Sequence, residues 1–247
     1  MLDYDREARN YDATRGGEPR AQAAADTLER LLPQGSCTIL DVACGTGIIT
    51  RKLLRPERTV LGVDRSSGML GLAMKRIPRG VVRADAARLP FASNSVDAVV
   101  IVWLLHLLRD PAPVLVEASR VLRPGGVLIT TVDKNDAYFV EESDVARVTA
   151  ELRSQYAPRV RDHRARVLDW AAKRGLGLAG ETVFPGVGQG RSPREWQQAI
   201  ETGEIPWCKR AAPDQVVDVR RRLSALPHQD AARPDPLYRL LALEKAV

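Results

Sequence analysis

Two acidic residues beside a glycine-containing turn have the types and the spacing of a binding site. The apolar run 39–42 contains Asp41 and leads into a turn with Gly45 and Gly47, and a second apolar run ends in Asp64. Glycine has no Cβ, so such a turn lets a ligand approach the backbone closely. A carboxylate after the second run can accept hydrogen bonds from both hydroxyls of a ribose. The pattern predicts a site for a ligand that contains adenosine.

The same turn argues against a dinucleotide as that ligand. A dinucleotide fingerprint has the pattern G-x-G-x-x-G, in which the glycines bring a pyrophosphate and a helix N-terminus together. Here Gly47 is followed by Ile-Ile-Thr at 48–50, without a third glycine, and we expect a helix to begin there. Asp41 would repel a pyrophosphate, whereas it would favour a cationic ligand.

Elements that alternate between strands and helices would position these residues. Short apolar runs predict strands at 38–42, 59–63, 80–83, 98–102 and 127–132. Amphipathic stretches separate them, a pattern typical of βαβ units that build a parallel sheet. The stretch 112–122 predicts a helix that ends before the breaker at 124–126. Residues 179–184 and 237–244 predict a final antiparallel pair of strands.

Two longer segments lie outside this alternation. Residues 133–177 are too long for a simple crossover and carry helical patterns at 142–154 and 164–174, and residues 187–235 hold a further polar helical region. Insertions on a rigid α/β scaffold often determine which substrate is bound. We therefore predict a single domain over 1–247 in which some residues of the two insertions form a lid over the substrate. The alternative is that these residues only cap the sheet.

Five motifs in order make the chain resemble the class I S-adenosylmethionine-dependent methyltransferases, within them the type 11 small-molecule branch that includes ubiquinone- and menaquinone-biosynthesis methyltransferases. The motifs are D-V-A-C-G-T-G at 41–47, G-V-D-R-S-S-G-M-L at 62–70, A-D-A-A-R-L-P-F at 84–91, V-D-A-V-V at 96–100 and V-L-R-P-G-G-V-L at 121–128. The resemblance implies a Rossmann-like, doubly wound α/β fold with a mostly parallel seven-stranded sheet of order 3-2-1-4-5-7-6. It also implies S-adenosyl-L-methionine as cofactor, S-adenosyl-L-homocysteine as product, and no metal.

The resemblance further implies a role for residues at the matched positions. Asp64 would bind the ribose hydroxyls, and Met69 would pack on the adenine face. Asp85 and the Ala86 N–H would bind the edge of the adenine ring. Ala43 stands where the family often has its first glycine, and we expect it to keep a negative φ. The full set of expected cofactor residues is Tyr11, Arg15, Asp41, Ala43, Gly45, Gly47, Asp64, Arg65, Met69, Asp85, Ala86 and Ile101.

The N-terminal segment 1–20 is amphipathic and contains a break at Gly16 and Gly17. Similar enzymes use such a segment to cover the cofactor, with a phenol and a basic group near the methionine carboxylate. Tyr11 and Arg15 fit these roles, because a phenol and a guanidinium both donate hydrogen bonds to carboxylates. The alternative is that Tyr11 packs in the interior and Arg15 is solvated.

Catalysis demands little of the protein in such a reaction. Methyl transfer from a sulfonium is an in-line displacement, so the protein mainly aligns the reactants and keeps water out. Only a nucleophile that must lose a proton needs a base. His106, after the fourth predicted strand, is the candidate, because histidine titrates near neutral pH. A lone histidine among leucines is more often structural. Nearby Trp103 could line a substrate, but a single tryptophan more often belongs to the core.

Composition limits the partners of the chain. Its 247 residues are 45% hydrophobic and 28% charged, as in ordinary globular domains. No apolar stretch approaches the roughly 20 residues that cross a bilayer, and the first residues lack a signal-peptide core. We therefore expect a cytoplasmic monomer or homodimer. The net charge of +6 comes from scattered arginines, so nucleic acid is not the expected partner, and the three cysteines show no metal-ligand spacing.

The leading hypothesis is an enzyme that methylates an O, N or C atom of a small organic molecule, such as a quinone or another specialised metabolite. A nucleic-acid methyltransferase is one alternative, although no Asn/Asp-Pro-Pro-aromatic tetrad follows the fourth predicted strand. A protein that binds the cofactor without turnover is another. The intact Asp64 and Asp85 favour cofactor binding but do not distinguish an enzyme from a sensor.

Overall fold

The computed structural model describes residues 3–156 and 161–247, which form two compact units. Unit 1 comprises 3–134, 161–185 and 238–247, and unit 2 comprises 135–156 and 186–237. Each unit has its own hydrophobic core. The described residues of the first predicted insertion therefore divide between the units, and those from 161 onward belong to unit 1.

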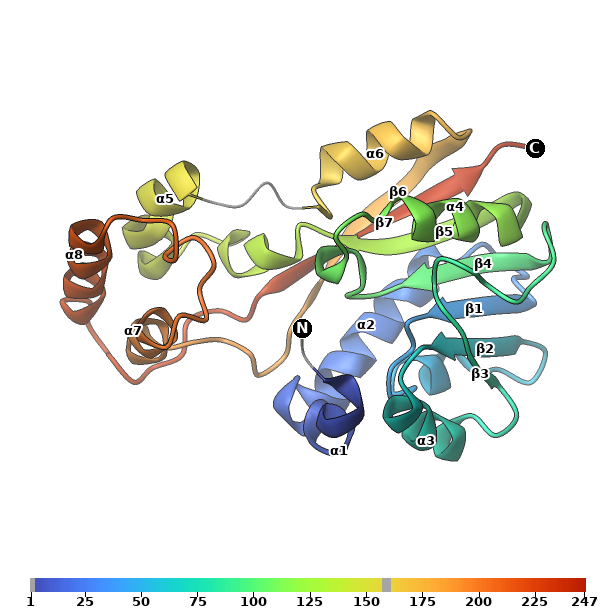
Figure 1. Ribbon diagram of the computed structural model, residues 1–247, viewed down its shortest axis with the longest axis horizontal. Helices are drawn as coiled ribbons and strands as arrows, with labels where there is room; N and C mark the ends of the chain where they lie inside the picture. The colour runs from blue at the N-terminus through green and yellow to red at the C-terminus, as the bar shows by residue number, and fades with distance from the viewer. Residues whose placement is uncertain (1–2, 157–160) are drawn as a thin grey trace. The chain divides into compact units, whose positions relative to one another are not determined.

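A seven-stranded sheet of order β3-β2-β1-β4-β5-β7-β6 forms the centre of unit 1 (Figure 1). Its strands are β1 (Thr38–Val42), β2 (Thr59–Asp64), β3 (Val81–Arg83), β4 (Val96–Ile101), β5 (Leu122–Val132), β6 (Leu176–Pro185) and β7 (Leu237–Lys245). Strands β1 to β5 pair in parallel, and β7 runs antiparallel to β5. The predicted fold class and strand order are confirmed.

Strand β5 begins five residues earlier than predicted, because the Pro-Gly-Gly breaker lies inside it rather than before it. The preceding helix does end at Val121, but the chain then pairs at once, with Leu122 opposite Val96. The register shifts before the next pair, Val127 opposite Ala98. A Cβ on Gly126 would lie 2.9 Å from a carbonyl oxygen of β4, so the irregular pairing depends on glycine.

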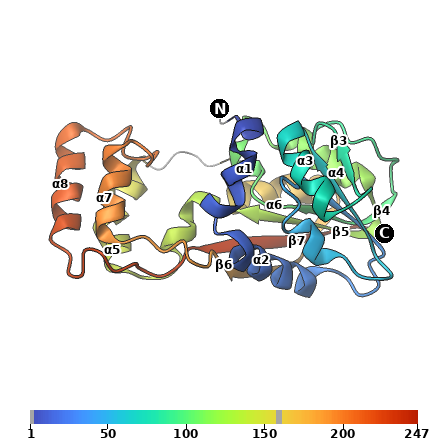
Figure 2. The ribbon, with the colours of Figure 1, turned by 90° about the horizontal axis from the view of Figure 1, so that it is seen from below.

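Helices cover both faces of this sheet. Those described in unit 1 are α1 (Tyr4–Thr14), α2 (Gly17–Leu31), α3 (Ser67–Arg76), α4 (Ala112–Val121) and α6 (Arg164–Ala172), with the short 3-10 helices η1 (Thr50–Leu53) and η2 (Leu105–Leu107). Figure 2 shows α2 on one face of the sheet and α4 and α6 on the other. The helix expected after the glycine turn is only η1. Arg55 precedes Pro56, and a proline disfavours helical backbone in the residue before it.

Unit 2 is helical and packs around its own aromatic residues. Its elements are η3 (Lys134–Phe139), α5 (Asp144–Tyr156), α7 (Pro193–Glu201) and α8 (Pro213–Ser224). Trp196 and Trp207 are 4% and 7% exposed in its core. A capping box between Ser192 and Glu195 fixes the start of α7. Among the described residues of both units, none forms a helix with the length and apolarity needed to cross a membrane.

Candidate functional site

The turn after β1 is left-handed at three positions. Ala43, Gly45 and Gly47 have φ angles of 62°, 55° and 72°. A Cβ on Gly45 would meet nothing within 4 Å, whereas one on Gly47 would lie 3.2 Å from Ala73 of α3. Gly45 therefore keeps space open beside the backbone, and Gly47 lets α3 pack closely. The expectation of a negative φ at Ala43 is wrong, and a left-handed alanine costs about 1–2 kcal/mol.

Hydrogen bonds to β2 explain why the turn accepts this strain. The Cys44 N–H donates to the Val63 carbonyl at 3.0 Å. The Gly45 N–H donates to Asp64 Oδ2 at 3.0 Å, and the Ser66 N–H donates to Asp64 Oδ1 at 2.8 Å. Both carboxylate oxygens of Asp64 are thus held in place, and each retains a lone pair for a further donor. The carboxylate is preorganised at the carboxyl end of β2, where ligands bind in open α/β sheets.

The N-terminal helix α1 is fastened over this region by two aspartates. Asp5 accepts hydrogen bonds from the Ser66 hydroxyl at 2.5 Å and the Gly68 N–H at 2.7 Å. Asp12 accepts from the Thr46 hydroxyl at 2.7 Å and forms an ion pair with Arg76 at 2.7 Å. These contacts tie α1 both to the glycine turn and to α3.

A cavity of about 630 Å³ lies in unit 1 between α1 and these strand ends. Its volume is in the range of sites for small molecules and cofactors. Eight of the twelve expected cofactor residues line it, namely Tyr11, Ala43, Gly45, Asp64, Arg65, Met69, Asp85 and Ala86. The fold thus brings residues from four separate chain segments around one space.

The part of the chain that carries this glycine turn and the two strand-end carboxylates is similar to known proteins. Residues 40–130 match the methyltransferase domain of type 11. Over these residues the chain is similar to that domain. One relative, a demethylmenaquinone methyltransferase from Corynebacterium kroppenstedtii, is 37% identical over 130 residues, which are 51% of this chain and 56% of that protein. A biotin biosynthesis bifunctional protein from Saccharophagus degradans is 39% identical over 114 residues, 44% of this chain and 20% of that protein.

The chain therefore spans no more than about half the length of these relatives. Solved structures match more of it at lower identity. A chain from a complex between the Haloferax volcanii Trm112 methyltransferase activator and a methyltransferase has a TM-score of 0.59, 21% identity and coverage of 100% of this chain and 98% of that chain. The geranyl diphosphate C-methyltransferase of Streptomyces coelicolor has a TM-score of 0.53, 18% identity and coverage of 91% and 79%. The [4+2]-cyclase SpnF has a TM-score of 0.55, 18% identity and coverage of 91% and 80%. These likenesses show a shared fold.

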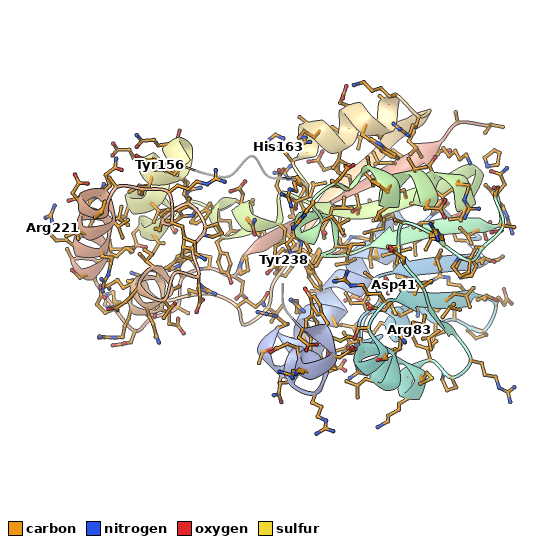
Figure 3. All side chains as sticks on the ribbon, viewed as in Figure 1. Asp41, Arg83, Tyr156, His163, Arg221 and Tyr238 are labelled. Carbon is orange, nitrogen blue, oxygen red and sulfur yellow. The ribbon has the colours of Figure 1, made fainter. Side chains whose placement is uncertain are left out.

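Four of the expected cofactor residues do not line the cavity. Gly47 faces α3, Ile101 is fully buried in the core, and the Arg15 side chain is exposed with its guanidinium 5.9 Å from the Tyr11 ring. Asp41, labelled in Figure 3, is 4% exposed and accepts a hydrogen bond from the Thr50 hydroxyl at 2.5 Å. Burial raises the pKa of Asp41 to about 7, and the charge of Asp64 adds to the rise.

His106 in η2 also lies outside the cavity lining. Its Nδ1 is buried without a hydrogen-bond partner among the described residues. Burial and the positive charge of Lys134 lower the pKa of its imidazole to about 3. The side chain is therefore neutral at physiological pH but is a weak base, since efficient bases have a pKa near the working pH. Its neighbour Leu107 lines the cavity instead.

The rest of the lining was not predicted as cofactor contacts. It comprises Tyr4, Val63, Ser66, Ala84, Val102, Trp103, Leu104, Leu107, Leu108, Arg109, Val114 and Arg161. Residues 102–104 could have been predicted from their place directly after a strand, because the carboxyl ends of parallel strands face the ligand. No local signal marks Arg161, whose guanidinium donates to the Leu108 carbonyl at 2.7 Å across a long sequence separation.

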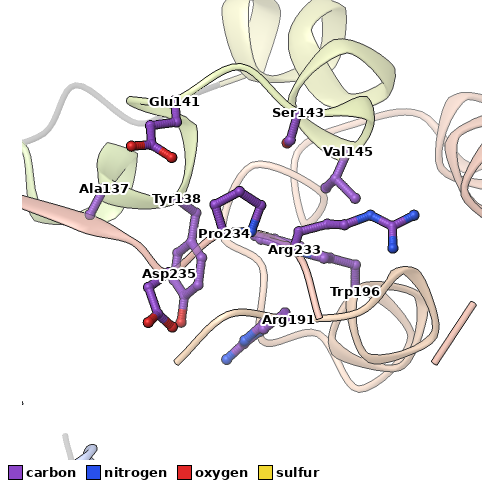
Figure 4. A pocket seen from close by; sticks show the side chains of 10 residues that line it. All are labelled: Ala137, Tyr138, Glu141, Ser143, Val145, Arg191, Trp196, Arg233, Pro234 and Asp235. Atoms are coloured by element: carbon purple, nitrogen blue, oxygen red, sulfur yellow. The ribbon is translucent and has the colours of Figure 1, made fainter. Parts of the chain in front are cut away.

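Unit 2 has a small pocket of its own beside Tyr138, Trp196 and Asp235 (Figure 4). Its volume of about 10 Å³ is close to that of one water molecule, so it does not admit an organic ligand in this form. The Arg233 guanidinium beside it is paired with Asp144 at 2.7 Å. In the parts of both units that the structure describes, no three potential ligands among His, Cys, Asp and Glu form a metal-binding group.

Proposed function

We propose that the chain binds S-adenosyl-L-methionine in the unit 1 cavity, transfers its methyl group to an O, N or C atom of a small organic molecule, and releases S-adenosyl-L-homocysteine. The observation that carries this proposal is the cavity itself. Residues from the glycine turn and from the ends of β2 and β3 meet there beneath Tyr11 of α1. The type 11 methyltransferase domain supports the same assignment.

The residues present fit this cofactor chemically. The space beside Gly45 accepts a ligand against the backbone, and Asp64 is held with free lone pairs for ribose hydroxyls. Asp85 accepts from the Ala87 N–H through Oδ1 at 2.9 Å, which leaves its Oδ2 for the adenine amino group. Met69 supplies an apolar surface for the base. A sulfonium is attracted by these carboxylates, whereas a pyrophosphate is repelled.

The bound cofactor would supply a methyl group that is already activated by its sulfonium. The protein then has to align an acceptor and keep water out. Tyr4 and Tyr11 of α1 line the cavity and would shield it from water. His106 is the base proposed from the sequence, but it lies outside the cavity lining, and with a pKa of about 3 it is a weak base. An acceptor that reacts without a strong general base fits this site best.

An organic acceptor is supported by the apolar part of the cavity wall, which Trp103, Leu104, Leu107, Leu108 and Val114 provide. We propose a quinone or another specialised metabolite, in a cytoplasmic protein. The name of the demethylmenaquinone methyltransferase relative supports a quinone. That residues 133–177 and 187–235 act as a lid over the substrate stays a prediction.

Cofactor binding without methyl transfer is a second candidate. It is favoured by the fold shared with a protein described as a [4+2]-cyclase, because one fold can host unrelated functions. Isothermal titration with S-adenosyl-L-homocysteine tests what both candidates share, and Asp64→Ala should weaken binding by about 1.5–3 kcal/mol for each charged hydrogen bond lost. No binding by the wild type would refute both, and unchanged binding by the variant would remove Asp64 from the site. Methyl transfer to quinone and phenol acceptors then separates the two candidates.

A further inference from the structure

Two arginines of unit 1, Arg109 and Arg161, line the cavity without an acidic partner. Both side chains are exposed, and among the described residues no carboxylate lies within ion-pair distance of either one. The Arg161 Nη1 donates to the Leu108 carbonyl at 2.7 Å, which uses one of the five N–H donors of a guanidinium. This bond holds the Arg161 guanidinium at the cavity wall and leaves donors for a ligand.

The acidic residues next to these arginines in the sequence bind other groups. Asp110 accepts a hydrogen bond from the Ala112 N–H at 3.0 Å, at the start of α4. Asp162 is fully buried and accepts from the Lys134 N–H at 3.0 Å. Neither carboxylate forms an ion pair with the arginine that precedes it. The positive charge at this part of the cavity is therefore available to an anionic ligand.

The fold separates these arginines from the residues proposed to bind adenosine. Asp64 and Asp85 follow β2 and β3, whereas Arg109 follows β4 and η2. Arg161 lies beside the end of β5, because the carbonyl of the next residue accepts from the Asp133 N–H at 3.0 Å. In the strand order β3-β2-β1-β4-β5 (Figure 1), the carboxylates and the arginines lie on opposite sides of β1. A cofactor with its adenosine at the carboxylates leaves the arginines for another ligand.

The cavity wall next to the arginines is apolar. Leu107 and Leu108 directly precede Arg109 and line the cavity with it, as does Val114 of α4. A ligand that fits this side therefore needs an apolar body for the wall and a negative charge for the guanidiniums. Arginine suits this role, since its planar fork binds carboxylate and phosphate groups through two parallel hydrogen bonds.

We propose that the methyl acceptor is an organic anion with an apolar body, and that Arg109 and Arg161 bind its carboxylate or phosphate group. The proposal rests on the proposed function and narrows its substrate class. Among the acceptors named above, it favours an acidic metabolite over a neutral quinone. Because both arginines are exposed, they also attract an anion from solution before it enters the cavity.

The test uses the protein saturated with S-adenosyl-L-homocysteine and a panel of aromatic and aliphatic ligands. Each ligand body is supplied as a carboxylic acid, as a phosphate monoester and as a neutral primary amide. Isothermal titration of the wild type should show an acid or a phosphate that binds about tenfold more tightly than its amide. Comparison of the acid with the phosphate identifies which of the two groups the arginines prefer.

Variants then assign the preference to the two arginines. The double variant Arg109→Gln with Arg161→Gln should bind the anion within about twofold of the amide, and S-adenosyl-L-homocysteine within about twofold of wild type. Lysine at both positions keeps the charge and should retain part of the preference. The matched control is Arg79→Gln with Arg166→Gln, which removes two charges from exposed positions of unit 1 outside the cavity lining. It should keep the full preference.

Three results would overturn the inference. The first is a wild type that binds S-adenosyl-L-homocysteine but prefers no acid or phosphate of the panel to its amide. The second is a preference that the double glutamine variant retains, which would mean that the anion binds elsewhere. The third is a double glutamine variant with weakened S-adenosyl-L-homocysteine binding, which would mean that the arginines bind the cofactor. A wild type that does not bind S-adenosyl-L-homocysteine refutes the proposed function, and the inference with it.

Discussion

Replacing the buried Asp41 by asparagine should stabilise the protein at alkaline pH far more than at acidic pH. Asp41 is 4% exposed at the end of β1. Burial raises the pKa of its carboxyl from 3.8 to about 7, and the hydrogen bond from Thr50 only partly opposes that rise. Asparagine has nearly the same shape, and its Oδ1 can still accept the Thr50 hydroxyl hydrogen at the 2.5 Å position.

The direction in which stability changes with pH follows from proton binding. Because the pKa is higher in the folded state, the folded protein binds the proton more tightly between pH 3.8 and about 7, and the free energy of unfolding falls as pH rises through that window. One pKa unit corresponds to about 1.4 kcal/mol, so the ionised carboxyl costs the folded state up to about 4 kcal/mol above neutral pH. The asparagine variant does not lose stability in this way, because its side chain does not ionise. Any change in stability caused by the new amide itself does not vary with pH.

The assay is urea unfolding of wild type and Asp41→Asn without ligand, followed by circular dichroism at pH values from about 4 to 8. From the acidic to the upper end of this range, the free energy of unfolding of the variant relative to that of the wild type should rise by about 2–4 kcal/mol. Glu57→Gln removes a carboxylate from an exposed position of unit 1 and should show no such gain. A difference for Asp41→Asn that stays constant with pH would mean that Asp41 is ionised with an ordinary pKa, and the reasoning from burial would be refuted.

Two further substitutions test the turn and its cover. Ala43→Gly should raise the free energy of unfolding by about 0.5–1 kcal/mol, because relief of the left-handed strain exceeds the entropy that glycine adds to the unfolded chain. A urea midpoint lower than that of the wild type would show that Ala43, with φ 62°, is not strained. Asp12→Ala should weaken S-adenosyl-L-homocysteine binding about tenfold in titration calorimetry, since it removes the ion pair with Arg76 and the bond from Thr46 that hold α1. Full affinity would show that α1 does not cover the ligand.

Much of the fold could be read from local pattern. Strands β1 and β2 agree with their predicted runs within one residue, because buried parallel strands are short continuous apolar segments between turns. The motifs gave the strand order through the family resemblance. Strand β5 was placed too late, because a glycine pair that breaks a helix can also form a bulge within a strand, and only the pairing partner distinguishes the two.

The candidate site was predictable where chemistry follows directly from a strand end. Asp64 and Asp85 are carboxylates at such ends, and both line the cavity. Ile101 and Gly47 were expected to line the cavity and do not. Whether such a residue faces a ligand or the core depends on the side on which a neighbouring element packs. The separation into two units was also not visible in the sequence, since the helical patterns at 142–154 and 164–174 look alike although α5 belongs to unit 2 and α6 to unit 1.

The sequence by itself determined the α/β class, the strand order through its motifs, and the pair of carboxylates beside a glycine turn. These are encoded by residue types at short spacings. Tertiary structure alone decided the protonation and exposure of the same residues. It buries Asp41 so that its pKa approaches neutrality, leaves Arg15 in solvent, and places Arg161 beside the same cavity as Arg109. The reason is physical: desolvation depends on what surrounds a group in space, and those neighbours come from distant parts of the chain.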